Sequence, residues 1–315
     1  MDSHGSIKSS ENDEFQIQRN EICGIDKKRF QQHFKISKSA IYLVIGIRTR
    51  LKSLLAVYNI IPRLPSVRKS IGIFLNPIDS TRVIEFSYLL RFIELSGIKP
   101  KIILDVSSPY ILAYLLSKIG KVVKTDINIE EKKNILESEN LFFMPGNATN
   151  LPFENNSFDL VYSISVIEHI YGNYFNAVRE MVRVTRPKGH IYLTFPVSSV
   201  RTEEWLDKNI YGHQHKENGR FFFQYRFNES DLHHICCCAE NVEILARSIY
   251  WEKKRGRYDK YILLMRKEYR NKKINFMKNI IVNNWAGFSL LEAHPRGFET
   301  QRTFGNASVI LKKLR

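Results

Sequence analysis

The sequence is poor in cysteine and has no long hydrophobic run. It holds 4 cysteines in 315 residues, and three of them, residues 236–238, are consecutive. Neighbouring cysteines pair only with strain and no Cys-x-x-Cys spacing occurs, so we expect no disulfide framework and predict a reduced, cytoplasmic protein. The longest apolar run, residues 40–47, is eight residues long, whereas about 20 residues are needed to span a bilayer.

Acidic residues are absent between Lys27 and Ile78, a stretch with 11 lysines and arginines. A second basic stretch, residues 253–278, holds 11 more against two acids. The whole chain has 48 basic and 32 acidic residues, so the remainder has 26 basic and 30 acidic ones. The positive charge is confined to these two segments. This favours two contact surfaces added to a domain, and it argues against a compact nucleic-acid-binding protein whose whole surface is positive.

The first basic stretch contains a helical pattern. Apolar residues recur at steps of three and four from Val44 to Tyr58, and Pro62 and Pro65 end the pattern. A basic amphipathic helix can lie on an anionic membrane surface, which predicts a peripheral membrane contact. The alternative, which we favour, is a helix packed on the domain with solvated lysines and arginines.

Strand-like and helix-like segments alternate from residue 83 onward. Short apolar runs typical of buried parallel strands precede helical segments that glycine or proline ends. The expected strands are residues 101–106, 122–126, 141–144, 158–164 and 190–195, and the expected helices are 83–95, 110–119, 129–137 and 174–184. The alternation predicts an α/β fold with a doubly wound parallel sheet, whose ligands bind beyond the carboxyl ends of the strands.

The turn after the first expected strand contains no glycine. It reads DVSSPYI from Asp105 to Ile111, whereas a dinucleotide needs Gly-x-Gly-x-x-Gly there so that the backbone can approach the pyrophosphate. NAD and FAD are therefore not expected, and no P-loop motif occurs. An adenosine ligand without phosphates suits the residues better. Asp126 can accept hydrogen bonds from both ribose hydroxyls, and Asn147 with Ala148 can meet an adenine edge.

The stretch from Asn147 to His169, NATNLPFENNSFDLVYSISVIEH, closely resembles the class I S-adenosylmethionine-dependent methyltransferases, in their type 11-like branch. Residues 183–193, RVTRPKGHIYL, are similar to the family's segment before strand five. The resemblance covers roughly residues 85–196 and implies that residues 242–250 and 307–312 are strands six and seven. The implied fold is a Rossmann-like, doubly wound seven-stranded sheet, mostly parallel with a last antiparallel strand, plus a helical N-terminal extension and insertions.

The resemblance implies S-adenosylmethionine as the cofactor. The residues that it assigns to cofactor binding lie at the strand ends: Asp105, Ser107, Ser108, Asp126, Ile127, Asn147, Ala148, Ser163 and Ser165. The family's first motif is Asp-x-Gly-x-Gly-x-Gly, and this sequence has Ser107, Pro109 and Ile111 in place of the glycines. Proline lacks an N–H donor but suits the start of a helix. Ser107 is expected to narrow the space for the methionine moiety.

Two histidines are candidate catalytic residues. Methyl transfer is an in-line displacement in which the protein mainly positions the reactants, but a hydroxyl or amine acceptor also needs a nearby base. His169 follows the fourth strand, and His213 lies where this family commonly builds its acceptor pocket. The alternatives are a packing role for His169 and exposed loop positions for His213 and its neighbour. No metal is predicted, because Ser165 replaces one carboxylate of the metal-binding relatives.

The predicted organisation is a basic helical extension over residues 1–80 and a methyltransferase domain over 81–315, with an acceptor insertion at about 197–240 and a basic lid at about 252–304. The leading hypothesis is methyl transfer to a small-molecule, glycan or lipid-linked acceptor. The competing one is a catalytically impaired scaffold that binds a membrane or a partner, because the first turn lacks glycine. RNA methylation is disfavoured, since the tetrapeptide Asn/Asp-Pro-Pro-Tyr/Phe does not occur.

Overall fold

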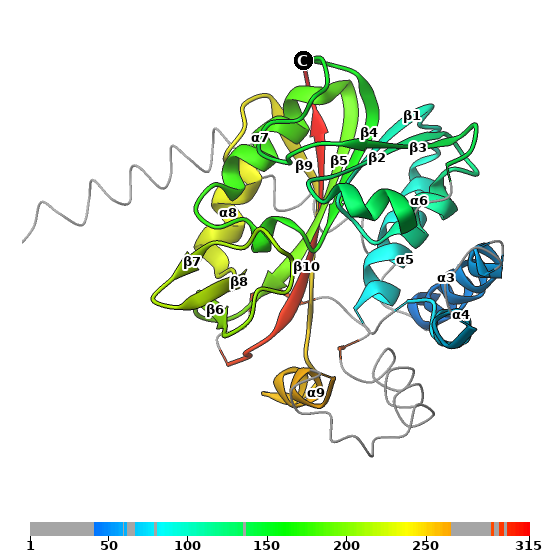
Figure 1. Cartoon of the computed structure of the whole chain (residues 1–315). Coiled ribbons are helices and arrows are strands. Elements are labelled where there is room, and N and C mark those ends of the chain that lie inside the picture. The colour runs from blue at the N-terminus through cyan, green and yellow to red at the C-terminus, as the bar shows by residue number, and fades with distance from the viewer. Residues whose placement is uncertain are drawn as a thin grey trace, which may run out of the picture.

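A seven-stranded sheet runs through the centre of the computed structural model, which describes residues 41–58, 60–61, 67–78, 81–134, 137–265, 291–292, 296–298 and 301–315. The strand order is β3-β2-β1-β4-β5-β10-β9 (Figure 1). The strands are β1 (Ile102–Val106), β2 (Lys121–Asp126), β3 (Leu141–Pro145), β4 (Phe158–Ile164), β5 (Thr185–Val197), β9 (Val242–Trp251) and β10 (Gly305–Lys313). The predictions for residues 1–40 and for residues 266–278, half of the second basic stretch, lie outside the described residues.

The strands β3, β2, β1, β4 and β5 are parallel. β10 inserts between β5 and β9 and is antiparallel to both. This arrangement confirms the predicted fold class, including the last antiparallel strand. Because the parallel strands all end on one edge of the sheet, the residues that follow β1, β2, β3 and β4 share that edge.

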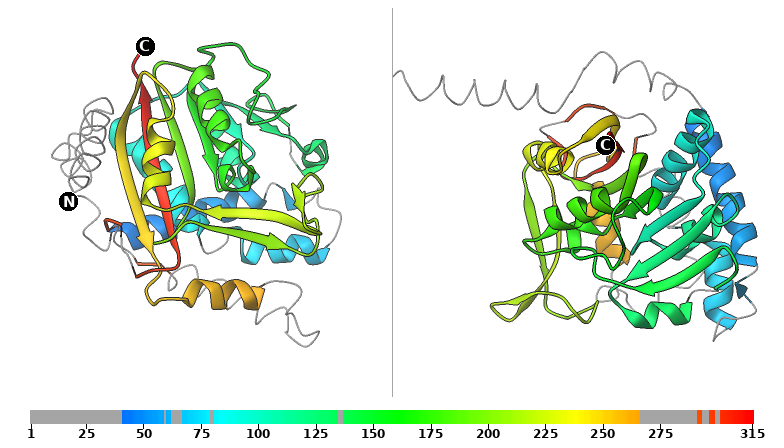
Figure 2. Two further views of the ribbon diagram at one scale, coloured as in Figure 1. Left: turned by 90° about the vertical axis from the view of Figure 1, so that its left-hand side faces the viewer. Right: turned by 90° about the horizontal axis from the view of Figure 1, so that it is seen from above.

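Helices cover both faces of the sheet. α5 (Arg82–Ser96) and α6 (Tyr110–Leu116) lie on one face, and α7 (Tyr174–Val184) and α8 (Glu229–Cys237) lie on the other (Figures 1 and 2). Each face has its own apolar core. The helix predicted for residues 129–137 is instead a 3-10 helix, η3 (Ile129–Asn134). Its charged sequence offers no apolar stripe to bury, and Ile129 is exposed.

The segment between β5 and α8 forms a second, three-stranded sheet, with the order β6-β8-β7. Its strands are β6 (Thr202–Leu206), β7 (Lys216–Glu217) and β8 (Arg220–Arg226). Arg226 of β8 contacts Glu204 of β6 and Asp259 of α9 (Arg257–Met265), with N–O distances of 2.6 Å in both pairs. This arginine therefore ties the small sheet to the helix that follows β9.

The helix predicted in the first basic stretch is α3 (Ile41–Tyr58), and α4 (Val67–Leu75) follows it. α3 packs on α5 and α6, as favoured, but through a face that the apolar pattern did not predict. Thr49 and Ser53 are buried against the domain, and the Ser87 hydroxyl of α5 donates to the Thr49 hydroxyl at 3.0 Å. The expectation of merely solvated basic side chains is wrong for Arg50, which is buried and donates to Asn76.

The three consecutive cysteines lie at the end of α8. Cys236 and Cys238 are free thiols, and burial raises the pKa of Cys236 to about 12, so this thiol is not ionised near neutral pH. The fourth cysteine, Cys23, lies outside the described residues, so the reduced state of the chain stays a prediction. Among the described residues, none of the helices has the length and apolar content to cross a membrane.

Candidate functional site

The acid at the end of β1 faces inward. Asp105 is fully buried and accepts hydrogen bonds from the backbone N–H of Ser108 and the hydroxyl of Tyr162, both at 2.8 Å, while Lys124 lies 3.4 Å away. Burial raises the pKa of Asp105, and Lys124, Tyr162 and Ser108 offset it only in part. The structure thus gives this predicted cofactor residue the task of holding the turn that follows β1.

That turn is tightly tied to its neighbours. Ser107 has a left-handed backbone with a φ of 55°, a conformation that favours the family's glycine. Its N–H donates to the carbonyl of Thr125 at 2.8 Å. The hydroxyl of Ser108 accepts from the backbone N–H of Ile164 at 2.9 Å, so this side chain joins the turn to the end of β4. Pro109 lies directly before α6, where its missing N–H costs no helical hydrogen bond.

The other predicted cofactor residues lie along the same edge. Asp126 is half-buried, and its Oδ1 accepts from the backbone N–H of Asn128 at 2.8 Å. Ile127 and Asn147 are exposed and Ala148 is buried. Ser163 is buried and donates to the carbonyl of Val106 at 3.2 Å.

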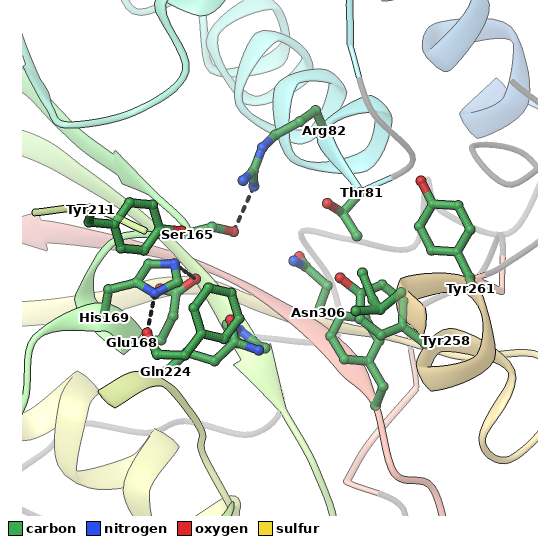
Figure 3. Close-up of a pocket in the computed structure, with 14 residues that line it drawn as sticks. Thr81, Arg82, Ser165, Glu168, His169, Tyr211, Gln224, Tyr258, Tyr261 and Asn306 are labelled. Atoms are coloured by element: carbon green, nitrogen blue, oxygen red, sulfur yellow. Dashed lines mark hydrogen bonds and ion pairs between the residues drawn. The ribbon is translucent and has the colours of Figure 1, made fainter. Parts of the chain in front are cut away.

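A cavity of about 210 Å³ lies on this edge beyond β4 and β5. Its walls come from the start of α5, from η4 (Ile167–His169), from the small sheet, from α9 and from the start of β10 (Figure 3). The lining residues are Thr81, Arg82, Ser165, Glu168, His169, Pro196, Tyr211, Phe223, Gln224, Tyr258, Tyr261, Ile262, Phe304 and Asn306. The structure therefore brings two predicted site residues, Ser165 and His169, into one cavity.

A buried carboxylate holds the floor of this cavity together. Glu85, in the first turn of α5, is fully buried, and its Oε1 accepts from the side chains of Ser165 and Thr194 at 2.8 Å and of Asn306 at 2.9 Å. Its Oε2 accepts from Arg82 at 2.5 Å. Burial alone raises the pKa of Glu85, but the charge of Arg82 and these hydrogen bonds outweigh it and lower the pKa. Glu85 is therefore ionised.

His169 is held in one tautomer. Its Nδ1 lies 2.5 Å from the carbonyl oxygen of Phe223, which can only accept, so Nδ1 carries the proton and Nε2 carries the lone pair. Burial lowers the pKa of His169 to about 4, and the positive charge of Arg82 adds to this effect. The imidazole is therefore neutral near pH 7.

Glu168 lies beside this imidazole. Its Oε1 is 3.8 Å from Nε2 of His169 (Figure 3), and its side chain is almost wholly buried. Burial raises the pKa of Glu168 to about 8, and the negative charge of Glu85 acts in the same direction. Near pH 7 the cavity wall thus carries a largely protonated carboxyl group next to a neutral imidazole.

Two buried oxygens in the cavity wall have no hydrogen-bond partner within the described residues. They are Oε2 of Glu168 and Oδ1 of Asn306. Buried polar atoms are normally satisfied by protein, water or a ligand. A small molecule with hydroxyl or amine donors would satisfy both oxygens.

The second predicted histidine lies outside the cavity. His213 is exposed, and its ring lies 6.5 Å from that of Tyr211, which does line the cavity. Sequence reasoning missed Arg82, Glu85 and Asn306, and it weighed Glu168 only as a metal ligand. A signal existed for Glu85, because an acid inside an otherwise apolar helical face is expected to be paired. No cluster that could hold a metal ion occurs among the residues that the structure describes.

Comparisons with known proteins agree with this geometry. Residues 106–193 match the family model described as a methyltransferase domain. An uncharacterised protein of Methanocaldococcus jannaschii is 31% identical over 121 residues, which cover 38% of this chain and 51% of that protein. A phthiotriol/phenolphthiotriol dimycocerosates methyltransferase of Mycobacterium leprae is 42% identical over 65 residues, 21% of this chain and 24% of that protein. The match thus spans about half of the length of the first relative and about a quarter of the length of the second.

Solved structures of similar fold include phosphoethanolamine N-methyltransferase 2 of Haemonchus contortus in complex with S-adenosyl-L-methionine. It is 14% identical, with a TM-score of 0.43, over 72% of this chain and 52% of that one. The strand order and the single antiparallel strand are those of the predicted Rossmann-like sheet. Residues 106–193 thus resemble a methyltransferase domain, as the stretch from Asn147 to His169 predicts.

The pKa of Glu168 makes stability depend on pH. Between about pH 4.5, where an unfolded glutamate ionises, and about pH 8, only the folded state binds this proton. Rising pH therefore favours the unfolded state, by up to about 1.4 kcal/mol per pH unit. We expect urea titrations between pH 6.5 and 8 to show a free energy of unfolding that falls with pH, and Glu168→Gln to remove this slope. Glu180→Gln, at a site with a lowered pKa, should keep it. Equal slopes in wild type and Glu168→Gln would contradict the assignment.

Proposed function

We propose that the protein transfers a methyl group from S-adenosylmethionine to a hydroxyl group of a small, sugar-like acceptor, free or lipid-linked. The observation that carries this proposal is the cavity beyond β4 and β5, where a protonatable carboxyl and a neutral imidazole lie among aromatic rings. The similarity of residues 106–193 to a methyltransferase domain supports the reaction class.

The edge of the sheet fits the cofactor. Asp126 lies at the end of β2, in the place where an acid binds ribose hydroxyls in nucleoside-binding folds. Ala148 and Ser163 have small side chains, which leave room for a ligand. The backbone N–H of Ser107 is bonded to the carbonyl of Thr125, and the hydroxyl of Ser108 is bonded to the N–H of Ile164. When bound, the cofactor supplies an electrophilic methyl group on a sulfonium.

The cavity suits a small polar acceptor with apolar ring faces. Its walls carry aromatic rings from the small sheet and from α9, including Phe223 and Tyr258, which can pack against the C–H face of a sugar. The oxygens of Asn306 and Glu168 without partners among the described residues can accept hydroxyl hydrogens. The predicted acceptor insertion and basic lid remain part of the proposal, since residues of both segments line the cavity.

The proton of the acceptor hydroxyl passes to the ionised form of Glu168, whose share grows as the pH approaches 8. A general base works best when its pKa lies near the working pH, and the pKa of Glu168 is about 8 whereas that of His169 is about 4. The bound cofactor would supply the methyl group, and its sulfur would keep the electron pair of the carbon–sulfur bond. His169 orients the acceptor through the lone pair of Nε2, and its tautomer is fixed by Phe223. The predicted base His169 is thus replaced by its neighbour.

The first prediction concerns the cofactor. Asp126→Ala should weaken binding of S-adenosylmethionine at least tenfold, because two hydrogen bonds to a carboxylate are lost, at about 1.5–3 kcal/mol each. Calorimetric titration into purified protein measures this. Glu130→Ala removes an exposed acid four residues away and should bind like wild type. If wild type itself gives no heat and no thermal shift, the scaffold hypothesis replaces this proposal.

The second prediction concerns the base. With radiolabelled S-adenosylmethionine and acceptor fractions of free and lipid-linked glycans, we expect wild-type label transfer to rise with pH up to about 8. Glu168→Gln should lower the rate about 10²–10⁴-fold, because the acceptor loses its base. Glu217→Gln, an exposed acid of the small sheet, serves as the matched control. A Glu168→Gln variant with wild-type rate and pH profile would refute the role of Glu168.

A further inference from the structure

The helices α3 and α4 form an outer layer that is separate from the cavity. They lie side by side beyond α5 and α6, on the side of the molecule away from α7 and α8 (Figures 1 and 2). α3 turns its Thr49 and Ser53 side toward the domain, with Thr49 bonded to Ser87. The opposite side of α3 therefore faces away from the protein.

That outer side of α3 is apolar. Ile47, Leu51, Leu55 and Tyr58 fall on one helix face, because they follow each other at steps of four, four and three. Their exposed fractions are 44%, 55%, 72% and 69%. An amphipathic helix normally buries such a stripe against its own core. Here the stripe is left outside, and the buried face of α3 carries Thr49, Arg50 and Ser53 together with Val57.

The neighbouring helix α4 repeats the pattern. Val67, Ile71, Phe74 and Leu75 have helical spacing on one face, and their exposed fractions lie between 39% and 77%. Together the two helices expose eight large apolar side chains. Monomeric proteins rarely leave so large an apolar surface in water unless it binds something.

The charge around these stripes identifies the occupant. Arg48 and Lys52 are exposed and directly follow Ile47 and Leu51, and the sequence between Lys27 and Ile78 has no acid. A one-signed basic rim around apolar helix faces is the pattern that inserts at the headgroup boundary of an anionic bilayer. Long basic side chains can bury their stems and keep their charges at the phosphates. We propose that α3 and α4 dock the protein peripherally on an anionic lipid bilayer, independently of the methyl transfer.

Vesicle flotation with the full chain tests the apolar part of this surface. We expect binding to vesicles of three parts phosphatidylcholine to one part phosphatidylglycerol, and Leu55→Glu should weaken it at least tenfold, because one fully inserted leucine is lost. Val200→Glu changes a residue of similar exposure, 69%, beyond β5 and should bind like wild type. Thermal unfolding should be unchanged in both variants, since neither side chain is buried.

The charge part is tested with the same vesicles. Arg48→Glu combined with Lys52→Glu should abolish binding, whereas Lys188→Glu combined with Lys208→Glu, two exposed lysines elsewhere, should weaken it only slightly. Equal binding to vesicles of pure phosphatidylcholine would show that the protein does not require anionic lipid, which would contradict the proposal. If wild type ignores both kinds of vesicle, the proposal is wrong. A wild-type dimer that Leu55→Glu converts to a monomer would show that a second copy covers the surface instead.

Discussion

The buried carboxylate of Glu85 is the constraint on which the cavity depends. A charge that is removed from water is tolerated only when partners surround it, and the partners here come from four separate elements. Arg82 belongs to the same helix, Ser165 follows β4, Thr194 lies in β5 and Asn306 lies at the start of β10. By fixing these four residues, Glu85 places the start of α5 against the carboxyl edge of the sheet.

The same network sets the chemistry of the acid beside it. Ser165 has a left-handed backbone, with a φ of 52°, and its hydroxyl both donates to Glu85 and accepts from Arg82. The chain then enters η4 directly, which puts Glu168 and His169 in the cavity wall. Because Glu85 is ionised, its charge adds to burial in keeping the proton on Glu168. The carboxylate of Glu85 thus stabilises the fold, and its charge also raises the pKa of Glu168.

The fold was predictable from local patterns, because buried strands and amphipathic helices each have a characteristic spacing of apolar residues in the sequence. β4 and α7 have the predicted bounds. The orientation of α3 was not predictable, since periodicity identifies an apolar stripe and not the side on which it lies. The network around Glu85 joins residues up to 221 positions apart, so only the folded chain reveals it. The sequence shows Glu168 next to His169, but it does not show the burial that raises the pKa of Glu168.

The most direct test of the account is the protonation of Glu168 itself. Carbon-13 NMR of protein labelled at the glutamate side-chain carboxyl can follow each group through a pH titration. The account predicts one resonance that titrates near pH 8 and is missing from Glu168→Gln. If every glutamate resonance titrates at or below the usual range of about pH 4–5, Glu168 is an ordinary ionised acid and cannot be the proposed base.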